Sequence, residues 1–203
     1  AAVQAKEEGF CHPVLLGNEE EIKRIADELE LSLDGCELVN LRDNSESERR
    51  LRYAKILAQK REREGFNLEV ARDKMFERNY FGMMMVETGD ADAFITGLYT
   101  RYAGTIQAAK EVIGIRPGYE HFGALHLVSS KNGICFFGDT LINRDPDEHA
   151  LYDLARLAAS GVRFFNRTPA MAMISYSNFG SDEDGKPAVV HRVVERMQKE
   201  YPE

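Results

Sequence analysis

Short apolar runs alternate with stretches of helical periodicity along almost the whole chain, and this alternation limits the fold more than any other feature. Strand candidates separated by amphipathic helices are typical of βα units, in which helices cover a largely parallel sheet. The sequence therefore predicts an α/β protein, with 203 residues to form one large or two small domains. The expected strands of this kind are residues 12–17, 36–41, 92–97 and 169–177.

The expected helices begin at recognisable caps. Asn18 with Glu21 three residues later forms a capping box, and Asn67 caps a helix that continues through a methionine-rich run. Asp145 is expected to cap a further helix, with Pro146 at its first position. The pattern predicts helices over residues 1–9, 18–30, 46–64, 67–89, 103–114, 145–161 and 188–200.

The pattern changes after residues 116–118, whose sequence Arg-Pro-Gly marks a domain boundary. The runs 122–130 and 133–142, joined through an Asn-Gly turn at 131–133, predict an antiparallel hairpin. We expect a first α/β domain at 1–117 and part of a second, containing the hairpin, at 118–203.

Composition excludes several classes of function. A formal net charge of −8 disfavours a general nucleic-acid or membrane-surface binder, which needs a broad basic surface. The apolar runs are shorter than a bilayer span and no signal peptide is recognisable, so we expect a cytoplasmic protein. Cys11, Cys36 and Cys135 are widely separated, which disfavours a disulfide framework or a structural metal site.

The stretch GSDEDGKP at 180–187 comes within one residue of a phosphate-binding P-loop. The loop requires a Ser or Thr after lysine to bind magnesium, and Pro187 stands there instead. The acids at 182–184 would also repel phosphate groups. We therefore expect no nucleotide at this loop.

The preceding residues are more informative, because they follow an expected strand at the end where α/β sheets bind ligands. Ser175, Ser177, Asn178 and Ser181 offer small donors and acceptors, and Gly180 permits close backbone approach. An ordinary loop rich in turn-forming residues remains the alternative.

Residues 49–63 carry seven cationic side chains and one acid. Such a run is usually a solvated helix face. Arg61, however, continues the apolar stripe of Leu51, Ala54 and Leu57 rather than the polar face. Its side chain therefore either extends to solvent at the helix end or points into a cleft, where it would suit a phosphate or carboxylate.

Three motifs, GDADAFITG, FFGDTLINRDPD and AMISYSNFGS, resemble the phosphate acetyl/butyryltransferase family in order and spacing. SYSNFGS, GIRPG and FGALHL are most similar to its branch fused to the C-terminus of bacterial NADP-dependent malic enzymes. The resemblance implies a three-layer αβα, two-domain phosphotransacetylase fold of the isocitrate dehydrogenase-like type, incomplete at both ends. The family's first strand would precede Ala1. Its final segments, with a serine and an aspartate central to acetyl transfer, would follow Glu203.

The resemblance also implies an inherited acyl-CoA cleft, without a catalytic residue or a metal ligand in this chain. Arg61 falls on a substrate-binding arginine of the family, whereas Gln107 and Ala108 replace the arginine and proline of a second motif. A neutral amide cannot supply the bidentate contact of a guanidinium. The implied ligand-binding residues are Arg61, Gly97, Thr105, Gln107, Ser175, Ser177 and Asn178.

Two functions follow from the resemblance. In the first, the chain is a non-catalytic, acetyl-CoA-responsive domain of a malic enzyme, which helps assemble a homo-oligomer. NADP and a divalent metal would then belong to the malic-enzyme catalytic domain, with no cofactor bound here. In the second, it is part of an active phosphate acyltransferase. Gln107 is the residue that favours the first.

Overall fold

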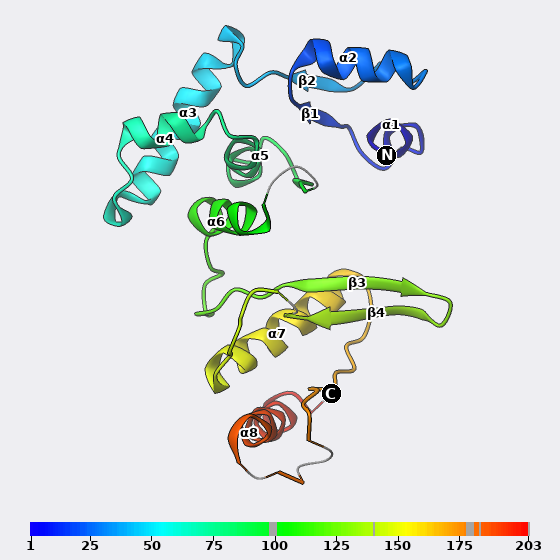
Figure 1. The fold of residues 1–203 in the computed structure, drawn as a ribbon, viewed down its shortest axis with the longest axis vertical. Coiled ribbons are helices and arrows are strands. Elements are labelled where there is room, and N and C mark those ends of the chain that lie inside the picture. Colours follow the sequence, from blue (N-terminus) through cyan, green and yellow to red (C-terminus); the bar gives the residue numbers. More distant parts are fainter. Residues whose placement is uncertain (98–100, 140, 178–180, 183, 203) are drawn as a thin grey trace. The chain divides into compact units, whose positions relative to one another are not determined.

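The computed structural model describes residues 1–97, 101–139, 141–177, 181–182 and 184–202. The chain forms two compact units, Ala1–Gly114 and Ile115–Glu203 (Figure 1). No helix in the described ranges is long and apolar enough to cross a membrane.

Unit 1 is mainly helical and contains a small parallel sheet. Strands β1 and β2 pair in parallel, with Val14 opposite Glu37 and Leu16 opposite Val39. The elements in chain order are α1 (Ala2–Glu7), β1 (Val14–Leu16), α2 (Glu19–Glu28), β2 (Glu37–Val39), the 3-10 turn η1 (Asn44–Glu46), α3 (Ser47–Lys60), the 3-10 turn η2 (Glu62–Glu64), α4 (Leu68–Lys74), α5 (Arg78–Glu87) and α6 (Tyr102–Val112).

The predicted caps of unit 1 are confirmed. The Asn18 side chain accepts from the Glu21 amide at 3.0 Å, and Asn67 does the same for Val70 at 2.8 Å. Gly65 takes a left-handed φ of 85° after η2, which ends the helical run. The single helix expected over 67–89 is wrong: it divides into α4 and α5 between Lys74 and Arg78.

The core of unit 1 is built where α3, α4 and α5 pack together. Tyr53 and Phe81 meet edge to face at 5.1 Å between ring centroids, surrounded by the fully buried Leu57, Met75 and Met84. Gly82 permits close packing of α5, because a Cβ there would lie 2.2 Å from the Phe94 ring. This core holds the residues after α5 against the helices.

The strand expected over 92–97 is wrong, although the side chains alternate as in a strand. Phe94 packs against the core and Thr96 donates to Asn79 at 2.7 Å, whereas Ile95 between them is 95% exposed. Across the described residues, β1 and β2 pair only with each other. The segment is extended without a neighbouring strand to bond its backbone, which a ladder requires.

Unit 2 joins a hairpin to two long helices. Its elements are β3 (Leu125–Ser130), β4 (Gly133–Gly138), α7 (Glu148–Phe164) and α8 (Gly185–Glu200). The predicted antiparallel hairpin is confirmed, with Leu125 opposite Gly138 and Ser130 opposite Gly133. The cap predicted for α7 at Asp145 is wrong by two residues. Asp147 is the cap, and its side chain accepts from the Ala150 amide at 2.8 Å. Helix α7 also continues past Gly161, so glycine did not end it.

The strand expected over 169–177 is also wrong. The described segment is irregular, and Ile174 and Tyr176 are 86% and 76% exposed. An apolar run becomes a buried strand only when a sheet receives it, and the hairpin pairs with no third strand in the described part of unit 2. Helix α8 instead packs on α7, where Arg192 pairs with Glu148 at 2.7 Å.

Candidate functional site

Two adjacent cations at the end of α3 bind the last carbonyl groups of α6. Lys60 Nζ donates to the carbonyls of Val112 at 2.7 Å and Ile113 at 3.3 Å. Arg61 donates from Nε to Glu111 at 2.6 Å and from Nη2 to Lys110 at 2.7 Å. The last carbonyls of a helix lack intrahelical partners and lie at the negative end of the helix dipole. The two cations therefore stabilise this end of α6 both by hydrogen bonds and by their charge.

The Arg61 side chain leaves α3 on the inward face, as the apolar stripe predicted, and is only 16% exposed. Nη1 pairs with Glu64 at 2.7 Å. Gly114, with a left-handed φ of 83°, makes room for the guanidinium, because a Cβ there would lie 2.8 Å from Nη2. The structure thus gives Arg61 partners within the protein, and its contact with an anionic ligand stays a prediction.

Gln107 lies one turn before the end of α6, and its amide donates to the Glu111 carboxylate. The Tyr80 hydroxyl of α5 donates to the other oxygen of the same carboxylate. Burial of the phenol, followed by the nearby Glu111 charge, raises the pKa of Tyr80. A carboxylate therefore occupies the helix face on which the family pattern places an arginine.

A second polar group links α5, α6 and the segment after α5. The buried Asn79 donates to the Thr105 hydroxyl at 3.2 Å and accepts from Thr96 at 2.7 Å. Gly97 follows with a φ of 151°. Asn79 therefore joins Thr96 to Thr105. Of the implied ligand residues in unit 1, Gly97 directly follows Thr96, and Gln107 lies further along α6 from Thr105. The sequence reasoning missed Asn79 and Glu111; the spacing of four between Gln107 and Glu111 was the available signal.

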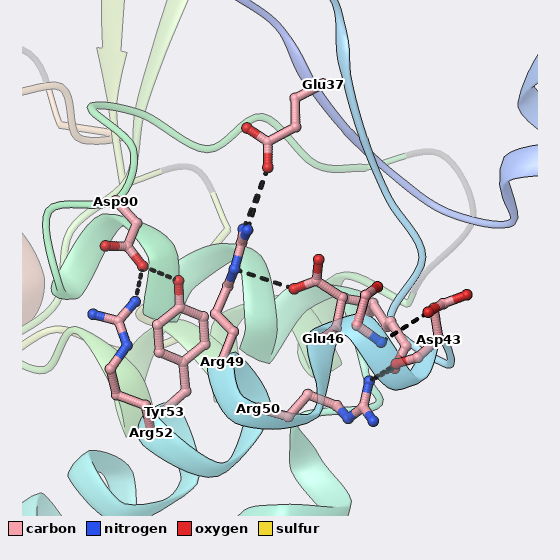
Figure 2. Close-up of polar contacts among 10 residues, drawn as sticks. Glu37, Asp43, Glu46, Arg49, Arg50, Arg52, Tyr53 and Asp90 are labelled. Atoms are coloured by element: carbon pink, nitrogen blue, oxygen red, sulfur yellow. Dashed lines mark hydrogen bonds and ion pairs between the residues drawn. The ribbon is translucent and has the colours of Figure 1, made fainter.

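The first half of α3 uses its arginines in the same structural way (Figure 2). Arg49 pairs with Glu46 at 3.1 Å and with Glu37 of β2 at 3.4 Å. Arg50 donates to the carbonyls of Leu41 and Asp43, each at 2.7 Å. These cations tie α3 to β2 and to the loop between them, so the basic run is largely an internal set of contacts.

Asp90, in the GDADA motif, accepts from both the Arg52 guanidinium and the Tyr53 hydroxyl (Figure 2). Burial by itself would raise the pKa of Asp90, but the Tyr53 hydroxyl and Arg52 together hold it below its usual range. Burial and the Asp90 carboxylate raise the pKa of Tyr53 to about 12. This motif residue therefore anchors α3 to the chain after α5.

Ser175, Ser177 and Ser181 of unit 2 form local hydrogen bonds with one another and with nearby backbone amides. Ser175 Oγ accepts from the Ser177 amide at 3.2 Å, and Ser177 Oγ lies 3.1 Å from Ser181 Oγ. Ser177 Oγ also accepts from the Asp182 amide at 3.1 Å. Asn178 and Gly180 lie outside the described residues. Lys186 is the lysine of the P-loop-like stretch at 180–187, and its Nζ pairs with Asp145 at 2.6 Å.

Asp139, in the motif after β4, has an unusual environment. Its φ is 48°, and both carboxylate oxygens are buried without a hydrogen-bond partner among the described residues. A buried carboxylate that accepts no hydrogen bond costs free energy. Among the described residues, no three His, Cys, Asp or Glu side chains lie close enough together to form a metal-binding site.

The two units combine helices with small β-sheets, which is the pattern of an α/β protein. Similarity to known proteins identifies the family to which this α/β chain belongs. Residues 1–203 match the phosphate acetyl/butaryl transferase model over their whole length, and the chain belongs to that family. The resemblance inferred from the three motifs is thereby confirmed.

Relatives of two kinds share the domain. The phosphate acetyltransferase of Nitratidesulfovibrio vulgaris is 34% identical over 92% of this chain and 26% of its own length. The NADP-dependent malic enzyme of Salmonella typhimurium is 30% identical over 96% of this chain and 26% of its own. The chain thus spans about a quarter of these relatives.

The fold class is confirmed by a solved structure. A phosphotransacetylase from Streptococcus pyogenes matches with a TM-score of 0.83 and 26% identity, over 100% of this chain and 61% of that one.

Proposed function

We propose that this chain is a phosphotransacetylase-like domain that binds acetyl-CoA or a related acyl-CoA and does not itself transfer the acyl group. The observation that carries the proposal is the Gln107–Glu111 hydrogen bond. Transfer to or from phosphate requires cationic donors around a developing anion. A neutral amide already engaged by a carboxylate cannot supply that contact, and the carboxylate opposes a nearby phosphate.

The malic-enzyme relative supports assigning this domain to a malic enzyme, because 96% of the chain matches that relative at 30% identity. In this proposal the domain is part of a cytoplasmic NADP-dependent malic enzyme, which converts malate to pyruvate, and acetyl-CoA is its effector. The catalytic domain of the same polypeptide supplies the NADP and metal sites, and the domain contributes to a homo-oligomer. Acyl-CoA would contact Arg61 and the Gly97–Thr105 region, with further contacts from Ser175, Ser177 and Asn178.

An active phosphate acetyltransferase is the second candidate. It is favoured by the acetyltransferase of N. vulgaris, which at 34% is more identical to this chain than the malic enzyme at 30%. In either candidate an anionic ligand at Arg61 would have to replace the contacts of that side chain with the carbonyls of α6.

The test measures binding and transfer on the same preparation of the intact domain. Isothermal calorimetry with acetyl-CoA is expected to show saturable binding, and an assay with acetyl phosphate and CoA is expected to show no enzyme-dependent thioester formation. Phosphotransacetylase of S. pyogenes serves as the positive control. Turnover within about tenfold of that enzyme, about 1.4 kcal/mol in barrier, would support the second candidate. Absence of both binding and turnover would refute both.

A further inference from the structure

The turn between β3 and β4 contains the pair Asn132–Gly133, and no other asparagine of the sequence is followed by glycine. The pair is chemically reactive, because a deprotonated backbone nitrogen can attack the side-chain carbonyl of the asparagine that precedes it. A side chain on the attacking residue hinders this approach, and glycine has none. The turn that the sequence predicted for the hairpin is therefore also a candidate site of chemical modification.

The structure leaves both reacting groups accessible. Lys131, Asn132 and Gly133 are all exposed. A Cβ added to Gly133 would have no described atom within 4 Å beyond its chain neighbours, so the space around this residue is open. The Asn132 amide donates to Ser130 Oγ at 3.2 Å, and Ser130 Oγ donates to the Gly133 carbonyl at 3.0 Å. These two contacts restrain neither the Asn132 side chain nor the Gly133 nitrogen.

The end of the hairpin that carries the turn can open without unfolding the rest of unit 2. Ser130 opposite Gly133 is the last pair of the ladder, and terminal pairs open at little cost in free energy. Helix α7 holds the other end, where a Cβ on Gly161 would lie 2.6 Å from Leu125 Cδ2. A two-stranded hairpin has little stability of its own in water. The Gly133 nitrogen therefore has the freedom to approach the Asn132 side chain.

We propose that Asn132 is a site of spontaneous deamidation. The Gly133 nitrogen gives its proton to the solvent and forms a bond to Asn132 Cγ, while the bond from Cγ to Nδ2 breaks and the amide nitrogen leaves as ammonia. Water then opens the resulting succinimide ring. Attack at Cγ gives aspartate, and attack at the main-chain carbonyl carbon gives isoaspartate. Water is the only co-reactant, and the proposal does not depend on the acyl-CoA ligand.

The modification would change the hairpin in two ways. Both products place a carboxylate at the tip of a hairpin whose twelve strand residues include no Asp, Glu, Lys or Arg. The net charge would become one unit more negative than the −8 of the unmodified chain. Isoaspartate also lengthens the main chain of the turn by one methylene group. Because turn geometry sets the register of a hairpin, we expect this product to weaken the Ser130–Gly133 pairing.

The test follows the reaction in the intact domain by peptide mapping with mass spectrometry at pH 7 and pH 9. Conversion of Asn132 is expected to be at least about tenfold faster at pH 9, because the deprotonated fraction of a weakly acidic amide rises about tenfold per pH unit. Asn166, which is exposed and followed by Arg167, is the internal control. It is expected to react at least about tenfold more slowly than Asn132. A protein isoaspartate methyltransferase is expected to methylate the peptide that contains residue 132.

Two further measurements test the structural argument. Conversion of Asn132 in the folded domain is expected to lie within about tenfold of its rate in urea, since opening of the turn costs little free energy. Gly133→Ala is expected to slow conversion at least about tenfold. Alanine is strained at the Gly133 φ of 114°, but the comparison with Asn166 requires no variant and decides the matter if Gly133→Ala does not fold. Conversion of Asn132 no faster than Asn166, a rate independent of pH, absence of isoaspartate, or stronger protection in the folded domain would overturn the proposal.

Discussion

The Gln107 amide donates to the Glu111 carboxylate one turn later on α6, and Tyr80 donates to the same carboxylate. Glu111 is also the residue whose carbonyl accepts from Arg61. Glu111 thus receives contacts from side chains at the end of α3, on α5 and on α6, and we expect its charge to oppose anion binding at this face of α6. Replacing Gln107 alone would leave that charge in place.

Gln107→Arg is expected to restore little anion binding, because Glu111 would pair with the new guanidinium. Removing the acid as well, in Gln107→Arg with Glu111→Gln, is expected to tighten acetyl-CoA binding at least about fivefold beyond the single variant, as 1 kcal/mol is about that factor. Calorimetry measures both, with Gln198→Arg on α8 as the control. Equal affinities for the single and double variants would show that Glu111 does not govern this face.

Arg61→Ala is expected to lower the free energy of unfolding by about 1.5–3 kcal/mol, the range for hydrogen bonds from a charged group. The variant leaves the carbonyls of residues 110 and 111 without their Arg61 donor. Arg63→Ala is the control, because Arg63 is exposed, and it should change stability by less than about 0.5 kcal/mol. Urea denaturation followed by circular dichroism measures the difference. Equal midpoints for the two variants would contradict the structural role.

Loss of the same side chain also tests ligand binding. When binding is measured by calorimetry under conditions where both variants are folded, Arg61→Ala is expected to bind acetyl-CoA more weakly than Arg63→Ala. Unchanged affinity in a folded Arg61→Ala protein would leave Arg61 as a purely structural contact with α6.

Asp90→Asn is expected to destabilise unit 1 by about 1 kcal/mol at pH 7, a value reduced for the partial exposure of the ion pair. Arg52 and Tyr53 hold the folded pKa of Asp90 below its unfolded value. The stabilisation is therefore present above the unfolded pKa and is lost as pH falls through the lower folded one. The two proteins should approach equal stability in acid. Urea midpoints from pH 7 down to pH 3 measure this, and a difference that persists in acid would contradict it.

Asp139→Asn is expected to stabilise the protein by about 1 kcal/mol at neutral pH, because it removes a buried charge whose oxygens accept no hydrogen bond from the described residues. Asparagine tolerates the left-handed φ of 48° at this position as well as aspartate does. Thermal unfolding by calorimetry measures the change, with Asp145→Asn, a largely exposed aspartate, as the control. A lower melting temperature for Asp139→Asn would show that the carboxylate has a donor in solution.

Local signals in the sequence were sufficient for the starts of α2 and α4 and for the hairpin. Asn18 and Asn67 cap helices because their side chains reach an amide three residues on, a contact that requires no distant partner. The hairpin likewise follows from two apolar runs and a short polar turn. The family motifs also identified the fold class, because they occur along the chain in the order and spacing typical of the family.

Tertiary structure decided the matters that depend on distant partners. Residues 92–97 and 169–177 have strand composition, yet a strand exists only where another backbone supplies its hydrogen bonds. The apolar stripe placed Arg61 on the inward face of α3, but only the folded chain shows that the carbonyls of α6 receive it. Helix periodicity determines the direction in which a side chain leaves its own helix. The partner it meets is determined by the packing of elements that are far apart in sequence.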